Sequence, residues 1–199
     1  MRRHPPRGAA AVPGAAFRAA LGAAVGAALF LCHPASAQDT APMPGLAPTG
    51  DKISEQRIPS YHRGTPVIAL SGPLTEEGVR EAKRVGFSAI LDLQADPARA
   101  ANERRNAEFA RIRYHHLPLH APAPSGEEVQ RFAAVLADRG NLPLLVHGAS
   151  PDQAGAMWAA YRASVGVPPA IALLDGETAG LSASRDAVRA GLGLPQETR

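Results

Sequence analysis

The chain has 199 residues, with 21 Lys or Arg, 18 Asp or Glu and a single cysteine. Four of the basic residues and none of the acidic ones precede residue 38, so the remainder holds 17 basic and 18 acidic residues, a net charge of −1. This balance gives no support for nucleic-acid or membrane-surface binding. Because Cys32 also precedes residue 38, residues 38–199 contain no cysteine. This excludes a cysteine nucleophile, a thiolate metal site and an iron–sulfur cluster in that part of the chain. We expect no metal and no cofactor.

Residues 1–37 have the pattern of a secretory signal. A basic start without acidic residues precedes a small and apolar run at 19–31, and Ala35-Ser36-Ala37 fits a cleavage site after Ala37. The run is shorter than the roughly 20 residues that a membrane span needs. We therefore predict export to the periplasm or beyond, with no membrane span after signal removal. A retained N-terminal anchor is the alternative.

The rest of the chain divides into a short tether and one folded domain. Residues 38–50 are rich in Pro, Ala and Gly and predict a flexible tether. Within 51–199, apolar runs bounded by turn residues predict strands, and capped segments with apolar residues at helical spacing predict helices. The predicted strands are 66–70, 87–93, 114–119 and 142–146, and the predicted helices are 75–85, 98–111, 126–138, 155–165, 168–174 and 182–190. This alternation indicates an α/β fold with a mostly parallel central sheet flanked by helices.

The segment after the last predicted strand is the candidate binding loop. An apolar run at 142–146 leads into a turn-rich octet and then into a helix. A strand, a tight loop and a helix start together direct backbone N–H groups toward an anion. The loop consists of His147, Gly148, Ala149, Ser150, Pro151, Asp152, Gln153 and Ala154.

Several ordered segments resemble the beta-lactamase hydrolase-like protein phosphatase-like domain, a family of small bacterial relatives of tyrosine and dual-specificity phosphatases. The similar segments are 70–75 (LSGPLT), 86–93 (GFSAILDL), Asn102-Glu103, 114–119 (YHHLPL) and 145–158 (LVHGASPDQAGAMW). The resemblance implies a cysteine-phosphatase-like fold. In the family, a thiolate attacks phosphorus, an Arg and loop amides hold the oxygens, and an acid protonates the leaving group.

The residues that carry this chemistry in the family are replaced in this chain. The nucleophile position falls on Gly148 and the anion-binding Arg position on Gln153. Glutamine cannot supply the charged fork of Arg. Pro151 also removes an N–H from the loop, and Asp152 adds a negative charge where an anion would bind. The resemblance therefore indicates a binding loop that has lost its catalytic groups.

Four side chains remain as candidates for other chemistry. His147 is interpreted as a hydrogen-bonded residue at the end of a strand, and Ser150 as a helix cap or a partner of loop amides. Asp152 is interpreted as an N-cap, with a phospho-accepting role as the alternative. His120 lies where related phosphatases often place an acid, although a loop histidine between prolines is more often simply exposed.

Other polar residues are assigned structural roles. The adjacent His115 and His116 face opposite sides of a strand and cannot form a two-ligand metal clip together. Asp92 and Asp96 are interpreted as turn formers. The run 103–105 (ERR) is interpreted as a solvated helix face.

The leading functional hypothesis is a pseudophosphatase, a binding or regulatory domain that retains the pocket without covalent catalysis. Its partner would be a protein or a small anionic ligand at the loop. One alternative is a phosphoric-ester hydrolase that uses His120, His147, Ser150 or Asp152 in place of cysteine. Another is a structural or interaction module of the cell envelope.

Overall fold

The computed structural model describes residues 45–196. The predicted signal at 1–37 and the first part of the predicted tether lie outside this range. In the part that is described, no helix has the length and apolar character needed to cross a membrane. Five short strands form one sheet in the order β1-β2-β5-β3-β4, in which β1 is antiparallel to β2 and the other pairs are parallel. The strands are β1 (His62–Thr65), β2 (Ile68–Ser71), β3 (Ala89–Asp92), β4 (Arg113–His116) and β5 (Leu144–His147).

Within residues 45–196, six α-helices connect and follow the strands. They are α1 (Glu76–Arg84), α2 (Pro97–Ala110), α3 (Gly126–Ala137), α4 (Pro151–Ser164), α5 (Pro169–Thr178) and α6 (Arg185–Gly191), with single 3-10 turns at Gly50–Lys52 and Arg139–Asn141. The first three helices begin at side-chain caps. Thr75 accepts a hydrogen bond at the start of α1, Asp96 caps α2, and Ser125 forms a capping box with Glu128 at α3.

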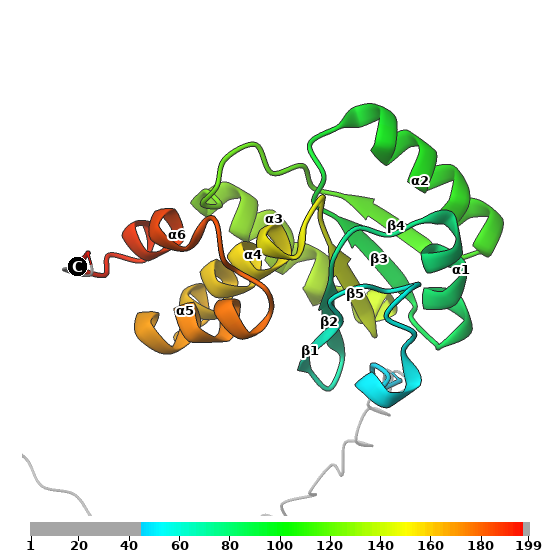
Figure 1. Cartoon of the computed structure of the whole chain (residues 1–199), viewed down its shortest axis with the longest axis horizontal. Coiled ribbons are helices and arrows are strands. Elements are labelled where there is room, and N and C mark those ends of the chain that lie inside the picture. The colour runs from blue at the N-terminus through cyan, green and yellow to red at the C-terminus, as the bar shows by residue number, and fades with distance from the viewer. Residues whose placement is uncertain (1–44, 197–199) are drawn as a thin grey trace, which may run out of the picture. The chain divides into compact units, whose positions relative to one another are not determined.

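The helices cover both faces of the sheet (Figure 1). On one face, Val79 and Ala82 of α1 and Ala107 of α2 pack against strand residues that include Ile90 and Leu145. On the other face, α3 and α4 pack against the sheet. Phe132, Met157 and Trp158 from these helices pack against Leu91 and Val146, among other strand residues. Apolar burial on both faces of the sheet explains why β2, β3 and β5 are continuous apolar runs rather than alternating ones.

The expected α/β architecture with a mostly parallel central sheet is confirmed, with some differences in its elements. The antiparallel edge strand β1 was not predicted, because its sequence HRGT has no apolar run. Helix α4 begins at Pro151, four residues before the predicted start, and α5 extends to Thr178. Ala47, within the segment predicted to be a tether, is 2% exposed, so packing of the domain begins before Asp51.

Candidate functional site

The ends of three neighbouring strands meet at the start of the candidate loop. His147, the last residue of β5, is in register with Ser71 at the end of β2 and with Asp92 at the end of β3. The chain then turns through residues 148–150 into α4. The carboxyl edge of a parallel sheet is where α/β proteins bind ligands, so the topology places the loop where the sequence predicts it.

The side chain of Gln153 fills the interior of the loop. Its Oε1 accepts a hydrogen bond from the Ala149 backbone N–H at 2.8 Å. A β-carbon added to Gly148 would lie 2.6 Å from Gln153 Oε1 and 2.8 Å from Gln153 Cβ. Real Cβ atoms do not approach other atoms so closely, and the close approach of the loop to α4 therefore depends on glycine at 148. An amide oxygen of the protein thus occupies a donor that the loop would otherwise offer to an anion.

Asp152 and Ser150 differ from their predicted roles. Ser150 is at the N-cap position of α4, but its side chain makes no capping hydrogen bond. The N-cap assignment of Asp152 is wrong, because the helix has already begun at Pro151. Instead, the Asp152 carboxylate accepts hydrogen bonds from Ser182 N at 2.7 Å, Ser184 N at 3.0 Å and Ser184 Oγ at 2.5 Å. It therefore ties the first turn of α4 to the segment that precedes α6.

These hydrogen bonds lower the pKa of Asp152. Partial burial alone would raise the pKa of the carboxyl group. The hydrogen bonds from Ser184 and from the backbone of 182–184 outweigh burial and lower the pKa below its ordinary value of 3.8. The first turn of α4 thus holds a negative charge beside the loop.

A buried charged cluster lies beneath the loop. His147 is 0% exposed, and its Nε2 is 2.6 Å from Glu103 Oε1 and 3.8 Å from Asp92 Oδ1. The other ring nitrogen, Nδ1, makes no hydrogen bond. Tyr114 donates to Asp92 Oδ2 at 2.6 Å, and the Gln94 side-chain amide donates to Glu103 Oε2 at 3.2 Å. The interpretation of His147 as a strand-end residue with a hydrogen-bond partner agrees with this geometry.

The cluster favours the protonated imidazole. Burial by itself lowers the pKa of His147, because it removes the imidazolium from water. The hydrogen bond to Glu103 and the charges of Glu103 and Asp92 act in the opposite direction and prevail, so the pKa of His147 is raised above 6.5.

Glu103 corrects the expectation that 103–105 is a solvated helix face. Arg104 and Arg105 are exposed, but Glu103 is 5% exposed and turned toward the sheet. Helical spacing contains the missing signal. The other buried residues of α2 are Ala100 and Ala107, three residues before and four residues after Glu103, on the same side of the helix. A carboxylate on the apolar stripe of a helix indicates a buried partner.

The remaining sequence candidates are separated from this cluster. His120 lines a cavity of about 290 Å³ together with the loop residues Ser150, Asp152 and Gln153 and with Ser184. His115 bonds to Asn141 and His116 to the Gln94 carbonyl, so the two do not share a site, as predicted. Asp96 caps α2, and Asp92 Oδ1 accepts the Gln94 backbone N–H at 2.8 Å, so both act as the turn formers that the sequence predicts. Asp92 also joins the buried cluster.

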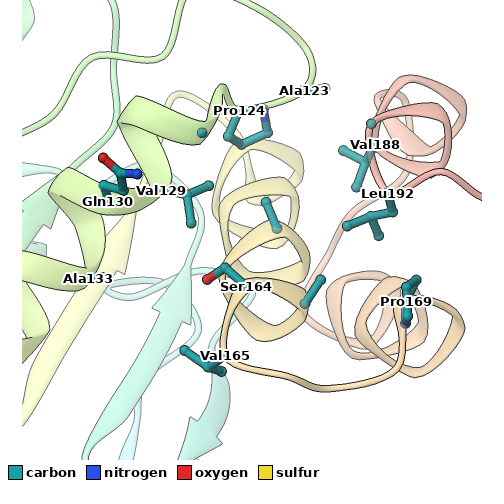
Figure 2. A pocket seen from close by; sticks show the side chains of 14 residues that line it. Ala123, Pro124, Val129, Gln130, Ala133, Ser164, Val165, Pro169, Val188 and Leu192 are labelled. Atoms are coloured by element: carbon teal, nitrogen blue, oxygen red, sulfur yellow. The ribbon is translucent and has the colours of Figure 1, made fainter. Parts of the chain in front are cut away.

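A larger cavity, of about 670 Å³, lies away from the loop. Figure 2 shows Val129 and Gln130 of α3 on one side and Val188 and Leu192 on the other, with α4 between them. None of its lining residues is ionisable. The cavity is therefore mainly a place for apolar contact, with the Ser164 hydroxyl and the Gln130 amide as its polar side-chain groups.

The fold is shared with small phosphatases. A DUF442 protein from Shewanella putrefaciens CN-32 superposes with a TM-score of 0.56 at 19% identity, covering 70% of this chain and 94% of that protein. TpbA of P. aeruginosa, solved in complex with pTyr, superposes with a TM-score of 0.56 at 22% identity, covering 75% and 94% of the two chains. At these identities the similarity establishes a common fold.

Sequence comparison identifies the family. Probable NAD kinase 2, chloroplastic, of Oryza sativa subsp. japonica is 29% identical over an alignment of 104 residues that covers 49% of this chain and 10% of that relative. The chain thus matches about a tenth of the relative's length. The family model described as DSP-PTPase phosphatase fused to NAD+ kinase matches residues 50–180, which is most of the described domain. The expected kinship with tyrosine and dual-specificity phosphatases is confirmed, and the chain belongs to this DSP-PTPase phosphatase family.

Proposed function

We propose that this protein is an exported phosphatase-like domain that has no phosphatase activity and acts by binding. The position of Gln153 is the observation that supports this most directly. Its amide oxygen accepts the Ala149 N–H, and its Cβ leaves no room for a side chain at 148. A phosphatase of this fold needs both that donor and a nucleophile at that position.

A protein partner fits the loop better than a small anion. The ionised Asp152 repels an anion, and the loop amide of Ala149 is already engaged. The cavity of about 290 Å³ beside the loop offers the His120 imidazole, the Ser150 and Ser184 hydroxyls and the Asp152 carboxylate. These groups suit a neutral or basic polar side chain of a partner protein.

Hydrolysis of an aryl phosphate tests the loss of activity. We expect no turnover by the purified protein. Turnover that disappears in Ser150→Ala, Asp152→Asn, His120→Ala or His147→Gln would contradict the proposal and identify the alternative nucleophile or acid. The Gln130→Ala variant, which changes a residue of the apolar cavity, is the matched control, because hydrolysis by contaminants in the preparation would be the same in it.

The double variant Gly148→Cys/Gln153→Arg tests the loop geometry separately. We expect it to remain inactive and to be less stable than the parent, because in the present loop conformation a Cβ at 148 would lie 2.8 Å from the Cβ of residue 153, and the loop would have to shift to hold both side chains. An active and stable double variant would show that the loop opens readily and that only the side chains were lost.

Binding and export complete the test. A partner recovered with the exported protein should be lost when Ser150→Trp fills the cavity and retained when Gln130→Lys alters the other cavity. Binding that survives both changes would favour a structural or interaction module with a docking surface elsewhere.

N-terminal sequencing of the exported protein tests signal cleavage. The sequence should begin at Gln38, whereas an intact N-terminal segment would indicate a membrane-anchored form.

A further inference from the structure

We propose that Asp92, Glu103 and His147 form a binding site for one divalent transition-metal ion, with Zn²⁺ as the preferred ion. The site is distinct from the loop cavity and does not depend on the function proposed for the loop. Three elements meet there, namely the end of β3, the middle of α2 and the end of β5. One ligand atom from each residue can be chosen so that all three lie within 4.8 Å of one another.

The donor spacing is close to what a metal ion requires. Zinc bonds of 2.0–2.2 Å place tetrahedral ligand atoms about 3.4 Å apart. The imidazole Nε2 is 2.6 Å from Glu103 Oε1 and 3.8 Å from Asp92 Oδ1. A metal ion between them requires Glu103 to move away by less than 1 Å from the nitrogen, about the change that a side-chain rotation provides.

The charges of the cluster favour a divalent cation. Two carboxylates share one imidazole, so with both carboxyl groups ionised the cluster carries −1 when His147 is protonated and −2 when it is neutral. Uncompensated charge is costly in a buried site. A divalent ion bound to neutral imidazole balances both carboxylates. Imidazole with carboxylate oxygens is a ligand set that zinc accepts.

The residues around the cluster support ligation and access. Tyr114 holds Asp92 and the Gln94 amide holds Glu103, which are the outer-sphere hydrogen bonds that orient metal-binding carboxylates. Glu103 and Gln94 also line a polar cavity of about 250 Å³ with Asn102, Asn106 and Thr75 at its wall. This cavity gives the ion a route from solvent and leaves room for a water molecule as the fourth ligand.

Zinc titration of the chelator-treated full-length protein tests the site, with calorimetry and bound-metal analysis as readouts. We expect the parent to bind one Zn²⁺ per chain. In Glu103→Gln the affinity for zinc should be weaker by at least about tenfold. The Glu108→Gln variant changes an exposed carboxylate on the same helix and should bind as the parent does. Both variants keep the other histidines and the predicted signal, so a difference in zinc binding between them reports the cluster alone.

Visible absorption and thermal unfolding give two further tests of the proposed ligands. Co²⁺ substitution should produce visible d–d bands in the parent and in Glu108→Gln but not in Glu103→Gln. Zn²⁺ should likewise raise the unfolding temperature of the parent and of Glu108→Gln but not that of Glu103→Gln. If Glu103→Gln does not fold, Asp92→Asn takes its place in all three measurements. Equal binding by parent and cluster variants, or no binding by the folded parent, would overturn the proposal and leave the cluster as a self-contained ion pair.

Discussion

At the scale of single residues, the His147 ring links the loop to the interior of the domain. Its backbone ends β5 directly before Gly148, and its side chain reaches Glu103 on α2. Removing one member of a buried ion pair typically costs about 3–5 kcal/mol, because the other charge is left without its partner. The cluster thus fixes the first residue of the loop, whatever the loop binds.

The raised pKa of His147 predicts a specific dependence of stability on pH. The folded state holds the His147 proton more tightly than the unfolded chain, whose histidine pKa is about 6.5. This stabilisation is fully present below pH 6.5 and is lost as the pH rises through the folded-state pKa. The free energy of unfolding should therefore fall above pH 6.5, by up to about 1.4 kcal/mol per pH unit.

Urea unfolding from pH 6 to pH 9 in the presence of a chelator measures this effect. The slope should be present in His120→Ala and absent in His147→Gln. His62, whose pKa burial lowers, acts in the opposite sense and only below pH 6.5, so it does not obscure this range. A flat profile for the parent above pH 6.5 would contradict the raised pKa.

At the scale of elements, α4 is held between the sheet and the C-terminal helices. Its inner face packs Met157 and Trp158 on the strands, while Ala156 and Ala159 pack with Leu173 of α5, with Leu181 and with Val188 of α6. Near its start, Asp152 ties the helix to the segment before α6. The helix that follows the loop is therefore constrained on several sides, which keeps the position of Gln153 fixed.

The close contact between α4 and α5 predicts that Gly155→Ala is strongly destabilising. The added Cβ would lie 2.4 Å from Leu181 N and 2.7 Å from the Gly176 carbonyl, both backbone atoms that cannot rotate away. Such overpacking costs about 1–3 kcal/mol, and this case should lie at or above the upper end. Gly126→Ala is the helical control, because its Cβ would meet nothing within 4 Å. Chemical denaturation of both variants measures the difference, and equal stabilities would refute the described packing.

At the scale of the whole molecule, the segment before the first strand is part of the folded domain. Ala47 is buried and donates its backbone N–H to the Pro66 carbonyl at 2.7 Å, and Tyr61 donates its hydroxyl to the Pro48 carbonyl at 2.5 Å. Further along, Arg57 pairs with the buried Glu81 of α1. Residues before β1 thus pack against α1.

A truncation at residue 51 should therefore weaken the domain. It removes the two hydrogen bonds made by Ala47 and Pro48, each worth about 1 kcal/mol, together with the buried Ala47 side chain. We expect a chain that begins at 51 to be about 2 kcal/mol less stable than one that begins at 45. Urea denaturation of the two forms gives the comparison, and equal stabilities would place residues 45–50 in the tether.

Local patterns in the sequence account for most of the secondary structure. The apolar runs at 68–71, 89–92 and 144–147 and the caps Thr75, Asp96 and Ser125 are signals that need no distant partner. The edge strand β1 lacks such a signal, because HRGT becomes a strand only by pairing with β2. The start of α4 at Pro151 also lacks a clear local signal, because residues 151–154 belong to an octet with the composition of a turn.

The α/β class, the position of the loop and the absence of a thiol at 148 can be read from the amino-acid sequence, because each depends on local pattern or on residue identity. Tertiary structure alone decided what the polar side chains do. It turned Gln153 into the loop, Asp152 toward Ser184, and Glu103 inward to His147, 44 residues away along the chain. The direction in which a polar side chain points depends on partners that are distant in sequence, and only the packed fold brings them within reach.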